Sequence, residues 1–263
     1  MKTINGVRVA IAGMGEMGTG MAAQLRKSGN YVVTEVRRDD DLTVLEEQSI
    51  FLAAMTPQDW GAVVDEETGK RASEQIAEHV NKSGVFTWIM AGIEVRRMRE
   101  DIGEGVAFVR AMPTLTVDGL SQTALYAEQG ALTAEQKEEI ESFYFQFGEY
   151  TWLDSEDQFS RYTLFAASMI ALLTDYLETY KSDAVEAGFS EELSEKILAG
   201  ALRSAAHLSS RGYTLRRIRD KVTTEGGMTE AVIHASRRRN ALRKLTRSMV
   251  RAGIKRSREL AKS

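Results

Sequence analysis

The sequence predicts an α/β protein: a doubly wound, parallel sheet in the N-terminal part, followed by an all-helical C-terminal domain. Short apolar runs alternate with helical patterns over the first 150 residues, which is typical of a sheet with helices on both faces. After Asp154 the strand patterns stop and only helical patterns follow. We therefore expect two domains, residues 1–154 and residues 155–263.

Seven apolar, β-branched runs have the length of buried strands. They are Val7–Ala12, Tyr31–Val36, Ser49–Ala54, Val85–Met90, Val106–Ala111, Ser121–Ala127 and, as a short extra strand, Tyr150–Leu153. Helices of the first domain are expected at Gly15–Ser28, Gln58–Asp65, Glu74–Lys82, Val95–Asp101 and Thr133–Phe147. Thr133 with Gln136 three residues later has the spacing of a capping box. The second domain is expected to hold helices at Asp157–Ala187, Ser190–Ser210, Thr214–Val222, Thr229–Asn240 and Ala241–Ala261.

The first expected strand runs directly into a G-x-G-x-x-G motif, Gly13-Met14-Gly15-Glu16-Met17-Gly18, and then into a helix. In a Rossmann-like domain the first glycine permits the tight turn, the second lets a pyrophosphate approach the backbone, and the third lets helix and strand pack closely. The helix N-terminus then offers free N–H groups to the phosphates. We therefore assign Gly13, Gly15, Glu16, Met17 and Gly18 to a dinucleotide cofactor. The alternative is an ordinary glycine-rich turn without a ligand.

The segment between the second and third expected strands is short. Only 22 residues separate Asn30 and Phe51, counting both ends, which leaves no room for the helix and strand that a standard Rossmann fold places there. The second strand ends in Glu35-Val36-Arg37-Arg38-Asp39. An acidic residue here would bind a ribose diol, whereas arginine would pair with a 2′-phosphate. Arg37 and Arg38 therefore favour NADPH over NADH, although a solvated charged turn explains them almost equally well.

Composition excludes several classes of protein. The chain has no cysteine, so disulfides and thiolate chemistry are absent. Three histidines show no metal-ligand spacing, and we expect no metal site. No apolar run approaches the length of about 18 residues that a membrane span needs, and the N-terminus has no signal-peptide pattern, so we expect a cytoplasmic protein.

Charge is distributed unevenly along the chain. Residues 1–202 contain 17 Lys/Arg and 34 Asp/Glu, whereas residues 203–263 contain 17 Lys/Arg and 4 Asp/Glu. Such a basic end can bind nucleic acid. Here the basic residues lie in helical patterns with regular apolar spacing and without interleaved aromatic residues, which favours a solvated or subunit-facing helix.

Further motifs follow in a fixed order. They are Phe51–Gln58, Ile89–Ile93, Val109–Pro113, Thr123–Ala127, Leu215–Thr229 and Lys255–Leu260. In this order the chain, from Val7 to Leu260, resembles the pyrroline-5-carboxylate reductase family. Those enzymes combine an N-terminal Rossmann domain with a helical domain that interlocks with a second subunit, and they reduce the C=N bond of pyrroline-5-carboxylate to make proline with NAD(P)H. The resemblance implies the same fold, cofactor and homodimer for this chain.

The resemblance also implies site residues. On the cofactor side, the family's V-K-P-Q turn corresponds to Met55–Gln58, which implies Thr56 as a cofactor contact, and the family's S-x-x-A-G-I motif implies Ala91 and Gly92. This chain has Thr56 instead of the family's lysine and Trp88 instead of its serine. The family's R-x-M-P-N-T-P motif implies that Met112 and Pro113 contact substrate; Thr114–Thr116 then departs from it.

The imine-binding loop of the family, V-T-S-P-G-G-T-T, corresponds to Val222–Thr229. It implies Gly226, Gly227, Met228 and Thr229 as substrate contacts, with Thr229 holding the ring nitrogen as the catalytic residue. Glu225 replaces a proline and Met228 replaces a threonine, and both changes disfavour a small anionic ring. The alternative for this loop is a plain connection between two helices.

Three functions remain open at this point. The first is an NAD(P)H-dependent reductase of a cyclic imine, which needs no His–Asp or lysine base because the cofactor delivers hydride and the protein supplies position. The second is a divergent paralogue with a degraded site, acting as a nucleotide-binding regulator or reducing another imine or carbonyl. The third, nucleic-acid binding, is the least favoured. The apolar helix Asp157–Ala187 predicts at least a dimer, with the active site where one subunit's nucleotide domain meets its partner's glycine loop.

Overall fold

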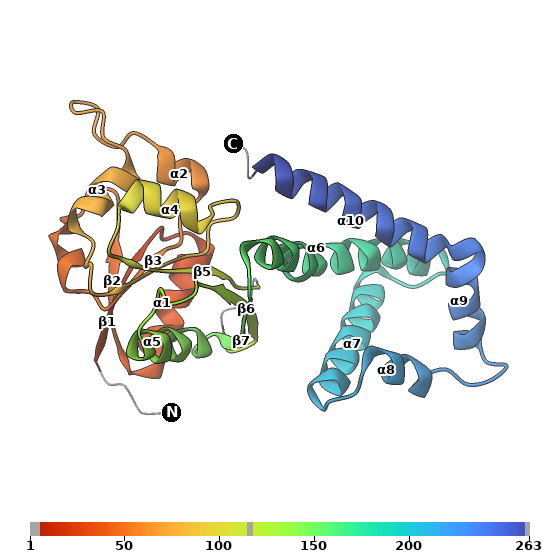
Figure 1. The fold of residues 1–263 in the computed structure, drawn as a ribbon. Helices are drawn as coiled ribbons and strands as arrows, with labels where there is room; N and C mark the ends of the chain where they lie inside the picture. Colours follow the sequence, from red (N-terminus) through yellow and green to blue (C-terminus); the bar gives the residue numbers. More distant parts are fainter. Residues whose placement is uncertain (1–5, 115–117, 261–263) are drawn as a thin grey trace. The chain divides into compact units, whose positions relative to one another are not determined.

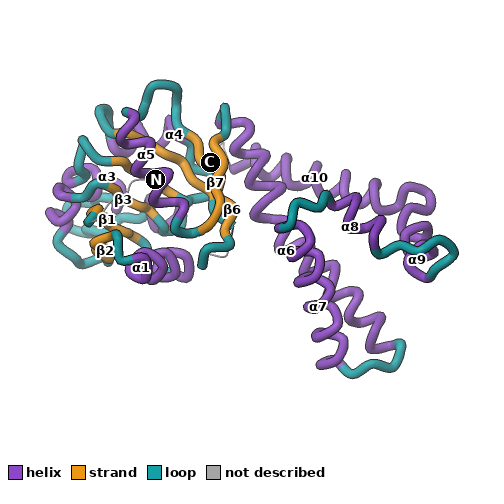
Figure 2. The backbone as a smooth tube through the Cα atoms, turned by 90° about the horizontal axis from the view of Figure 1, so that it is seen from below, coloured by secondary structure: helices purple, strands orange, loops and turns teal. Residues whose placement is uncertain are grey.

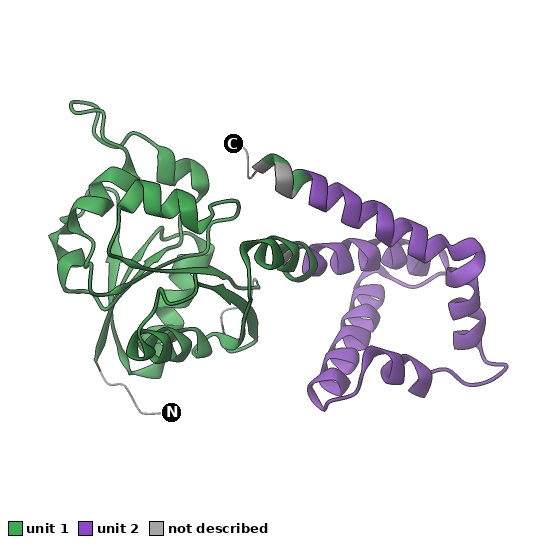
Figure 3. Ribbon diagram, viewed as in Figure 1, with its two compact units in different colours: residues 1–167, 256–263 green, residues 168–255 purple. Residues whose placement is uncertain are grey.

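The computed structural model describes residues 6–114 and 118–260, and the chain divides into two compact units (Figure 3). The first unit comprises residues 1–167 and 256–263, and the second comprises residues 168–255. The first unit extends to residue 167, past the expected domain boundary between residues 154 and 155. That boundary stays a prediction. Residues 115 and 116 of the Thr114–Thr116 motif and the expected helix end at Ala261 lie outside the described ranges.

A seven-stranded sheet forms the centre of the first unit (Figure 1). Its order is β2-β1-β3-β4-β5-β6-β7, and all seven expected strands are present. Their bounds are β1 Val7–Ala12, β2 Tyr31–Val36, β3 Ile50–Ala53, β4 Val85–Trp88, β5 Ala107–Met112, β6 Ser121–Tyr126 and β7 Gly148–Trp152.

One pair of strands departs from the expected parallel sheet. β5 and β6 are antiparallel, whereas the other five neighbouring pairs are parallel. The connection between β5 and β6 is only residues 113–120, and a parallel crossover needs about a dozen residues or more. The sheet is therefore mostly parallel, with the last two strands reversed.

The loss of one helix–strand step is confirmed. β2 lies at the edge of the sheet, and the chain returns from it to β3 on the other side of β1 through a single 3₁₀ helix, η1 (Leu42–Glu47). In the standard order a further strand would lie outside β2. This edge is where the adenosine half of a dinucleotide binds in Rossmann domains, so the shortening changes the walls of that part of the site.

Helices cover both faces of the sheet (Figure 1), and Figure 2 shows the same elements from below. α1 (Glu16–Ser28) and α5 (Ala134–Phe145) pack one apolar cluster, which includes Met21, Leu25, Phe143 and Tyr144. α2 (Pro57–Gly61), α3 (Ala72–His79) and α4 (Val95–Ile102) enclose the other. The capping box at the start of α5 is confirmed, because Thr133 Oγ1 accepts from Gln136 N at 3.1 Å and Gln136 Oε1 accepts from Thr133 N at 3.0 Å.

The expected helix Gln58–Asp65 is wrong beyond Gly61. Residues 62–72 instead form a hairpin-like excursion, in which Val64 N donates to Lys70 O at 3.0 Å and Val63 bridges Arg71. The Asp65 carboxylate accepts from the backbone N–H groups of residues 67 and 68, and Gly69 has a φ of +71°. The turn chemistry of Asp65 and Gly69 therefore overrides the helical pattern.

The second unit is helical. α6 (Glu156–Glu186) begins in the first unit, and the chain continues through α7 (Glu191–Ser210), α8 (Leu215–Lys221), α9 (Met228–Arg237), a 3₁₀ turn η2 (Arg238–Asn240) and α10 (Ala241–Leu260). Arg239 and Asn240 have positive φ values, which interrupt the helical conformation between α9 and α10. No helix within the described residues is long and apolar enough to cross a membrane.

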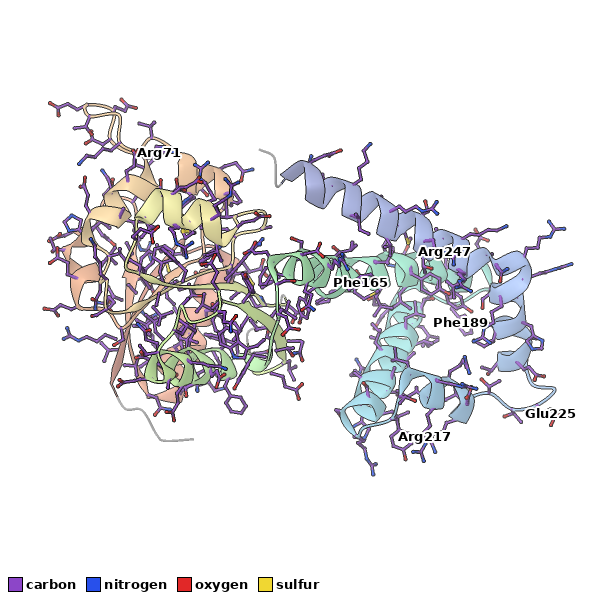
Figure 4. All side chains as sticks on the ribbon, viewed as in Figure 1. Arg71, Phe165, Phe189, Arg217, Glu225 and Arg247 are labelled. Atoms are coloured by element: carbon purple, nitrogen blue, oxygen red, sulfur yellow. The ribbon has the colours of Figure 1, made fainter. Side chains whose placement is uncertain are left out.

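This helical unit has no buried apolar centre of its own. Among the described residues after Phe159, no hydrophobic side chain is buried. Large apolar side chains along α6 and α7 are exposed instead; they include Phe165, Met169, Leu173, Tyr176, Leu193 and Ile197 (Figure 4 labels Phe165). Helices with so much exposed apolar surface gain too little burial to be stable alone, so a further protein surface must cover them.

We expect Phe86→Ala to destabilise the sheet unit by about 3–5 kcal/mol, because it removes the ring at the centre of an aromatic cluster. The Phe86 ring centroid lies 4.8 Å from that of Phe51 and 5.9 Å from those of Trp60 and Phe108. The measurement is urea unfolding followed by tryptophan fluorescence, since all three tryptophans lie in the first unit. Phe145→Ala, at an exposed phenylalanine of α5, is the control, and an equal loss there would contradict the prediction.

Candidate functional site

The turn between β1 and α1 is the best-defined part of the site. Gly13 has a φ of +94°, and a Cβ added there would lie 2.4 Å from the backbone nitrogen of Met55. A Cβ on Gly18 would lie 2.1 Å from the carbonyl oxygen of Gly13. Real Cβ atoms do not approach backbone atoms so closely, so neither position accepts a side chain. The turn and the start of α1 are therefore held directly against the loop after β3.

Gly15 differs from its two neighbours in the motif. Its φ is −77°, and a Cβ added there would meet no protein atom within 4 Å. No residue that the structure describes requires a glycine at this position. Open space above the backbone is what the second glycine of a dinucleotide motif provides for a pyrophosphate.

The start of α1 can accept an anion. Gly15 is the N-cap, and no side chain caps the helix, so the first N–H groups, beginning with those of Glu16 and Met17, have no side-chain acceptor. α1 is 13 residues long, and its dipole places partial positive charge at this end. The start of α1 thus leaves N–H groups available beside the glycine motif, and the assignment of this motif to phosphate binding stays a prediction.

A hollow of about 340 Å³ opens beside this turn, and that volume lies within the usual range of small-molecule sites. It is bounded by residues that follow β1, β2 and β3 and by the start of α3. The lining residues are Ala12, Gly13, Met14, Val36, Arg37, Arg38, Leu42, Met55, Asp59, Ala62, Val64, Ala72, Gln75 and Ile76. The hollow therefore lies at the carboxyl ends of the parallel strands, where ligands bind in open α/β sheets.

The two arginines after β2 are in different electrostatic settings. Arg37 Nη2 lies 3.2 Å from Glu35 Oε2, and Arg26 Nη1 lies 2.7 Å from Glu35 Oε1. The hydrogen bond from Arg26, followed by that from Arg37, lowers the pKa of the half-buried Glu35 carboxyl. Arg38 has no ion pair with any residue that the structure describes, and its guanidinium reaches only the Val63 carbonyl oxygen at 3.4 Å. Of the two arginines that line the hollow, Arg37 is paired with a carboxylate, whereas Arg38 has no carboxylate partner among the described residues.

The remaining cofactor candidates lie at the ends of β3 and β4. Thr56 is exposed and caps α2, accepting from Asp59 N at 3.1 Å and donating to Asp59 Oδ2 at 2.7 Å. Ala91 is exposed in the turn after β4, and Gly92 has a φ of +81°. Trp88 is buried and donates through Nε1 to the Ile93 carbonyl oxygen at 2.9 Å. Neither Thr56, Ala91 nor Gly92 lines the hollow, so their cofactor roles stay predictions.

The R-x-M-P segment is mostly buried. Arg110 is 3% exposed and donates from Nη1 to Glu156 Oε2 at 2.7 Å. Its guanidinium carbon Cζ lies 4.3 Å from the centroid of the Phe159 ring. Burial raises the pKa of the Glu156 carboxyl, and the Arg110 charge opposes that shift. Met112 packs with Phe159, and Pro113 is also buried. These contacts give the segment a structural role at the start of α6, and substrate contact by Met112 and Pro113 stays a prediction.

The glycine loop lies between α8 and α9, in the second unit. Gly226 has a φ of +72°, and its N–H donates to Glu230 Oε2 at 2.9 Å. Gly227 is the N-cap of α9, whose start has no side-chain cap. Met228 is 88% exposed and Thr229 is exposed. The Glu230 carboxylate thus already accepts one N–H of the loop. The substrate roles of residues 226–229 stay predictions.

Several residues of the hollow carried no signal in the sequence. Leu42, Val64, Gln75 and Ile76 come from η1, from the 62–72 excursion and from α3. None belongs to a motif, and their sequence separation from Gly13 is large. They reach the glycine turn only because η1, the 62–72 excursion and α3 pack around the hollow. Within the described residues, no group of three or more His, Asp or Glu side chains could hold a metal ion.

The fold and the glycine turn define the class: a Rossmann-type dinucleotide-binding domain joined to a helical domain. Residues 156–260 match the family model described as "Pyrroline-5-carboxylate reductase dimerisation". Pyrroline-5-carboxylate reductase of Mycobacterium tuberculosis is 26% identical over 293 aligned positions, covering 97% of this chain and 95% of the relative. The chain is thus similar to pyrroline-5-carboxylate reductases along nearly its whole length, as the order of motifs predicted.

Solved structures agree with that fold. The pyrroline-5-carboxylate reductase from Coxiella burnetii has a TM-score of 0.82 at 22% identity and covers 98% of this chain and 100% of that chain. The pyrroline carboxylate reductase of Plasmodium falciparum, solved with NADP bound, has a TM-score of 0.80 at 15% identity, covering 98% and 99%. The similarity extends over both compact units.

We expect Gly18→Ala to lower the free energy of unfolding by about 1–3 kcal/mol, because its Cβ would overlap the Gly13 carbonyl. Gly15→Ser should leave stability within about 0.5 kcal/mol of the wild type, since the Cβ meets nothing and serine is a good N-cap. Urea unfolding followed by tryptophan fluorescence compares the two variants. Equal destabilisation would contradict the distinct roles of the two glycines.

Proposed function

We propose that this chain is an NAD(P)H-dependent oxidoreductase that reduces a cyclic C=N bond. Pyrroline-5-carboxylate, whose reduction gives proline, is the first substrate to test. The observation that carries the proposal is Gly15: a glycine that no protein contact requires, placed at an uncapped helix N-terminus beside a hollow with an unneutralised arginine. The names of the relatives support the choice of reaction.

The residues present fit a dinucleotide. The N–H groups at the start of α1 would hold the pyrophosphate above Gly15, while the apolar wall of the hollow would take the adenosine end. Glu35 is already held by Arg26 and Arg37, so it is not free to accept the ribose diol, and Arg38 would pair with a 2′-phosphate. We therefore propose NADPH as the preferred cofactor. When bound, the cofactor supplies a hydride to the imine carbon.

Thr229 is the residue that we propose to hold the substrate. Its hydroxyl would donate a hydrogen bond to the ring nitrogen, which keeps the C=N bond oriented while the carbon is reduced. Gly226 and Gly227 would give that loop its tight turn. Met228 and, from the first unit, Met112 and Pro113 complete the proposed substrate contacts.

A homo-oligomer follows from the helical unit. Its described residues bury no hydrophobic side chain, and the matched family model is that of a dimerisation domain. A second copy that presents the same apolar helices would cover this surface as an isologous dimer. We propose at least a dimer with interlocked helical domains, in which the glycine loop of one subunit serves the nucleotide domain of its partner.

One observation favours the second candidate function, a nucleotide-binding protein that does not reduce pyrroline-5-carboxylate. The Glu230 carboxylate accepts the Gly226 N–H, and Glu225 is exposed two residues before Gly227 (Figure 4). Two negative charges would oppose the carboxylate of that substrate. NADPH binding without turnover of pyrroline-5-carboxylate would select this candidate, or a reductase of another imine or carbonyl compound.

We expect Arg38→Ala to raise the Kd for NADPH about 10- to 100-fold, because a charged hydrogen-bonded pair contributes about 1.5–3 kcal/mol. The Kd for NADH should change by less than about threefold, since NADH has no 2′-phosphate. Calorimetric titration of both nucleotides measures the two constants. Arg8→Ala, at an arginine outside the hollow, is the control. Equal losses for NADPH and NADH would show that Arg38 does not read the phosphate.

We expect Thr229→Val to lower kcat for imine reduction about 5- to 10-fold, as expected for one neutral hydrogen bond, with the Kd for NADPH unchanged. Oxidation of NADPH at 340 nm with pyrroline-5-carboxylate is the assay. Thr224→Val, at an exposed threonine of the same loop, should retain wild-type turnover. An unchanged kcat in Thr229→Val would remove Thr229 from the site.

A further inference from the structure

We propose that Gln75 recognises the edge of the adenine base, and that the 62–72 excursion forms the wall against which the base packs. The inference rests on the proposed function, because it assumes that the hollow binds a dinucleotide. It adds a base-reading residue that no sequence motif contains.

The 62–72 excursion takes the place of a missing structural element. In the standard fold the strand beyond β2 and its helix border the adenosine site, but here β2 is the sheet edge. Ala62 and Val64 of the excursion and Ala72 at the start of α3 line the hollow instead. The excursion is closed at its base by Ala72 N, which donates to Ala62 O at 2.9 Å, and Arg38 reaches its Val63 carbonyl.

Four polar side chains line the hollow: Arg37, Arg38, Asp59 and Gln75. Arg37 pairs with Glu35, Arg38 contacts the Val63 carbonyl, and Asp59 accepts from Thr56. The Gln75 carboxamide makes no hydrogen bond with any residue that the structure describes, although its side chain is half-buried. It is therefore the polar group of the hollow whose donor and acceptor both remain available to a ligand.

The chemistry of a carboxamide suits adenine. It presents one acceptor and one N–H₂ donor side by side, and adenine offers an amino group next to a ring nitrogen acceptor. Glutamine forms this bidentate pair with adenine in nucleic-acid recognition. Leu42, Val64 and Ile76 supply the apolar surface that packs against the faces of a base. On the edge formed by the amino group and N7, a guanine or hypoxanthine carbonyl would leave two acceptors side by side, which a carboxamide cannot pair with in either orientation.

The test uses a base analogue with the full-length protein. Kd values are measured by calorimetry for NADPH and for its hypoxanthine analogue, in which a carbonyl oxygen replaces the adenine amino group. We expect the wild type to bind NADPH about 10-fold more tightly than the analogue, and Gln75→Leu to bind both equally. Gln58→Leu, at an exposed glutamine of α2 outside the hollow, should keep the wild-type ratio.

The outcomes separate this inference from the proposed function. Equal affinity of the wild type for NADPH and the analogue, or an unchanged preference in Gln75→Leu, overturns the role of Gln75 while NADPH binding itself stands. Failure of the wild type to bind either nucleotide overturns the proposed function and the inference together. Because the ratio is measured on the wild type as well, the test does not depend on the folding of the variant.

Discussion

The close approach of the first βα turn to the loop after β3 is the constraint on which the site depends. Gly13 and Gly18 are required because any Cβ would overlap backbone atoms of Met55 or of Gly13 itself. This packing fixes the N-terminus of α1 at the end of β1, with its N–H groups directed out of the sheet. It also leaves open space above the backbone of Gly15, where we propose that the pyrophosphate binds.

The shortened edge of the sheet determines how the other half of the site is built. Without a strand beyond β2, the hollow would be open on that side, and the chain closes it with an excursion between α2 and α3. Arg38 links the two parts through the Val63 carbonyl, and the hydrogen-bonded turn at Asp65 keeps the excursion folded back on itself. One wall of the hollow thus comes from a segment that the usual fold does not use.

The second unit has a different physical problem, since its helices expose the apolar residues that a domain normally buries. Hydrophobic burial is the main favourable term in folding, so these helices need a partner surface. The basic residues of α10 are then more readily understood as the polar face of a packed amphipathic helix than as a nucleic-acid surface. The glycine loop belongs to this unit. Its Glu225 and Glu230 carry negative charges that would repel the carboxylate of a substrate such as pyrroline-5-carboxylate.

The sequence by itself determined every strand, the missing helix–strand step and the close packing at Gly13 and Gly18, because these depend on hydrophobic period and on local backbone sterics. It could also place Arg37 and Arg38 at the end of a strand. Tertiary structure alone decided that Arg26 of α1 also pairs with Glu35, that Arg38 forms no ion pair with a described residue, and that β6 runs antiparallel to β5. It likewise brought Val64, Gln75 and Ile76 to the glycine turn, because contacts between residues far apart in the chain have no periodic signal and arise only when distant segments pack.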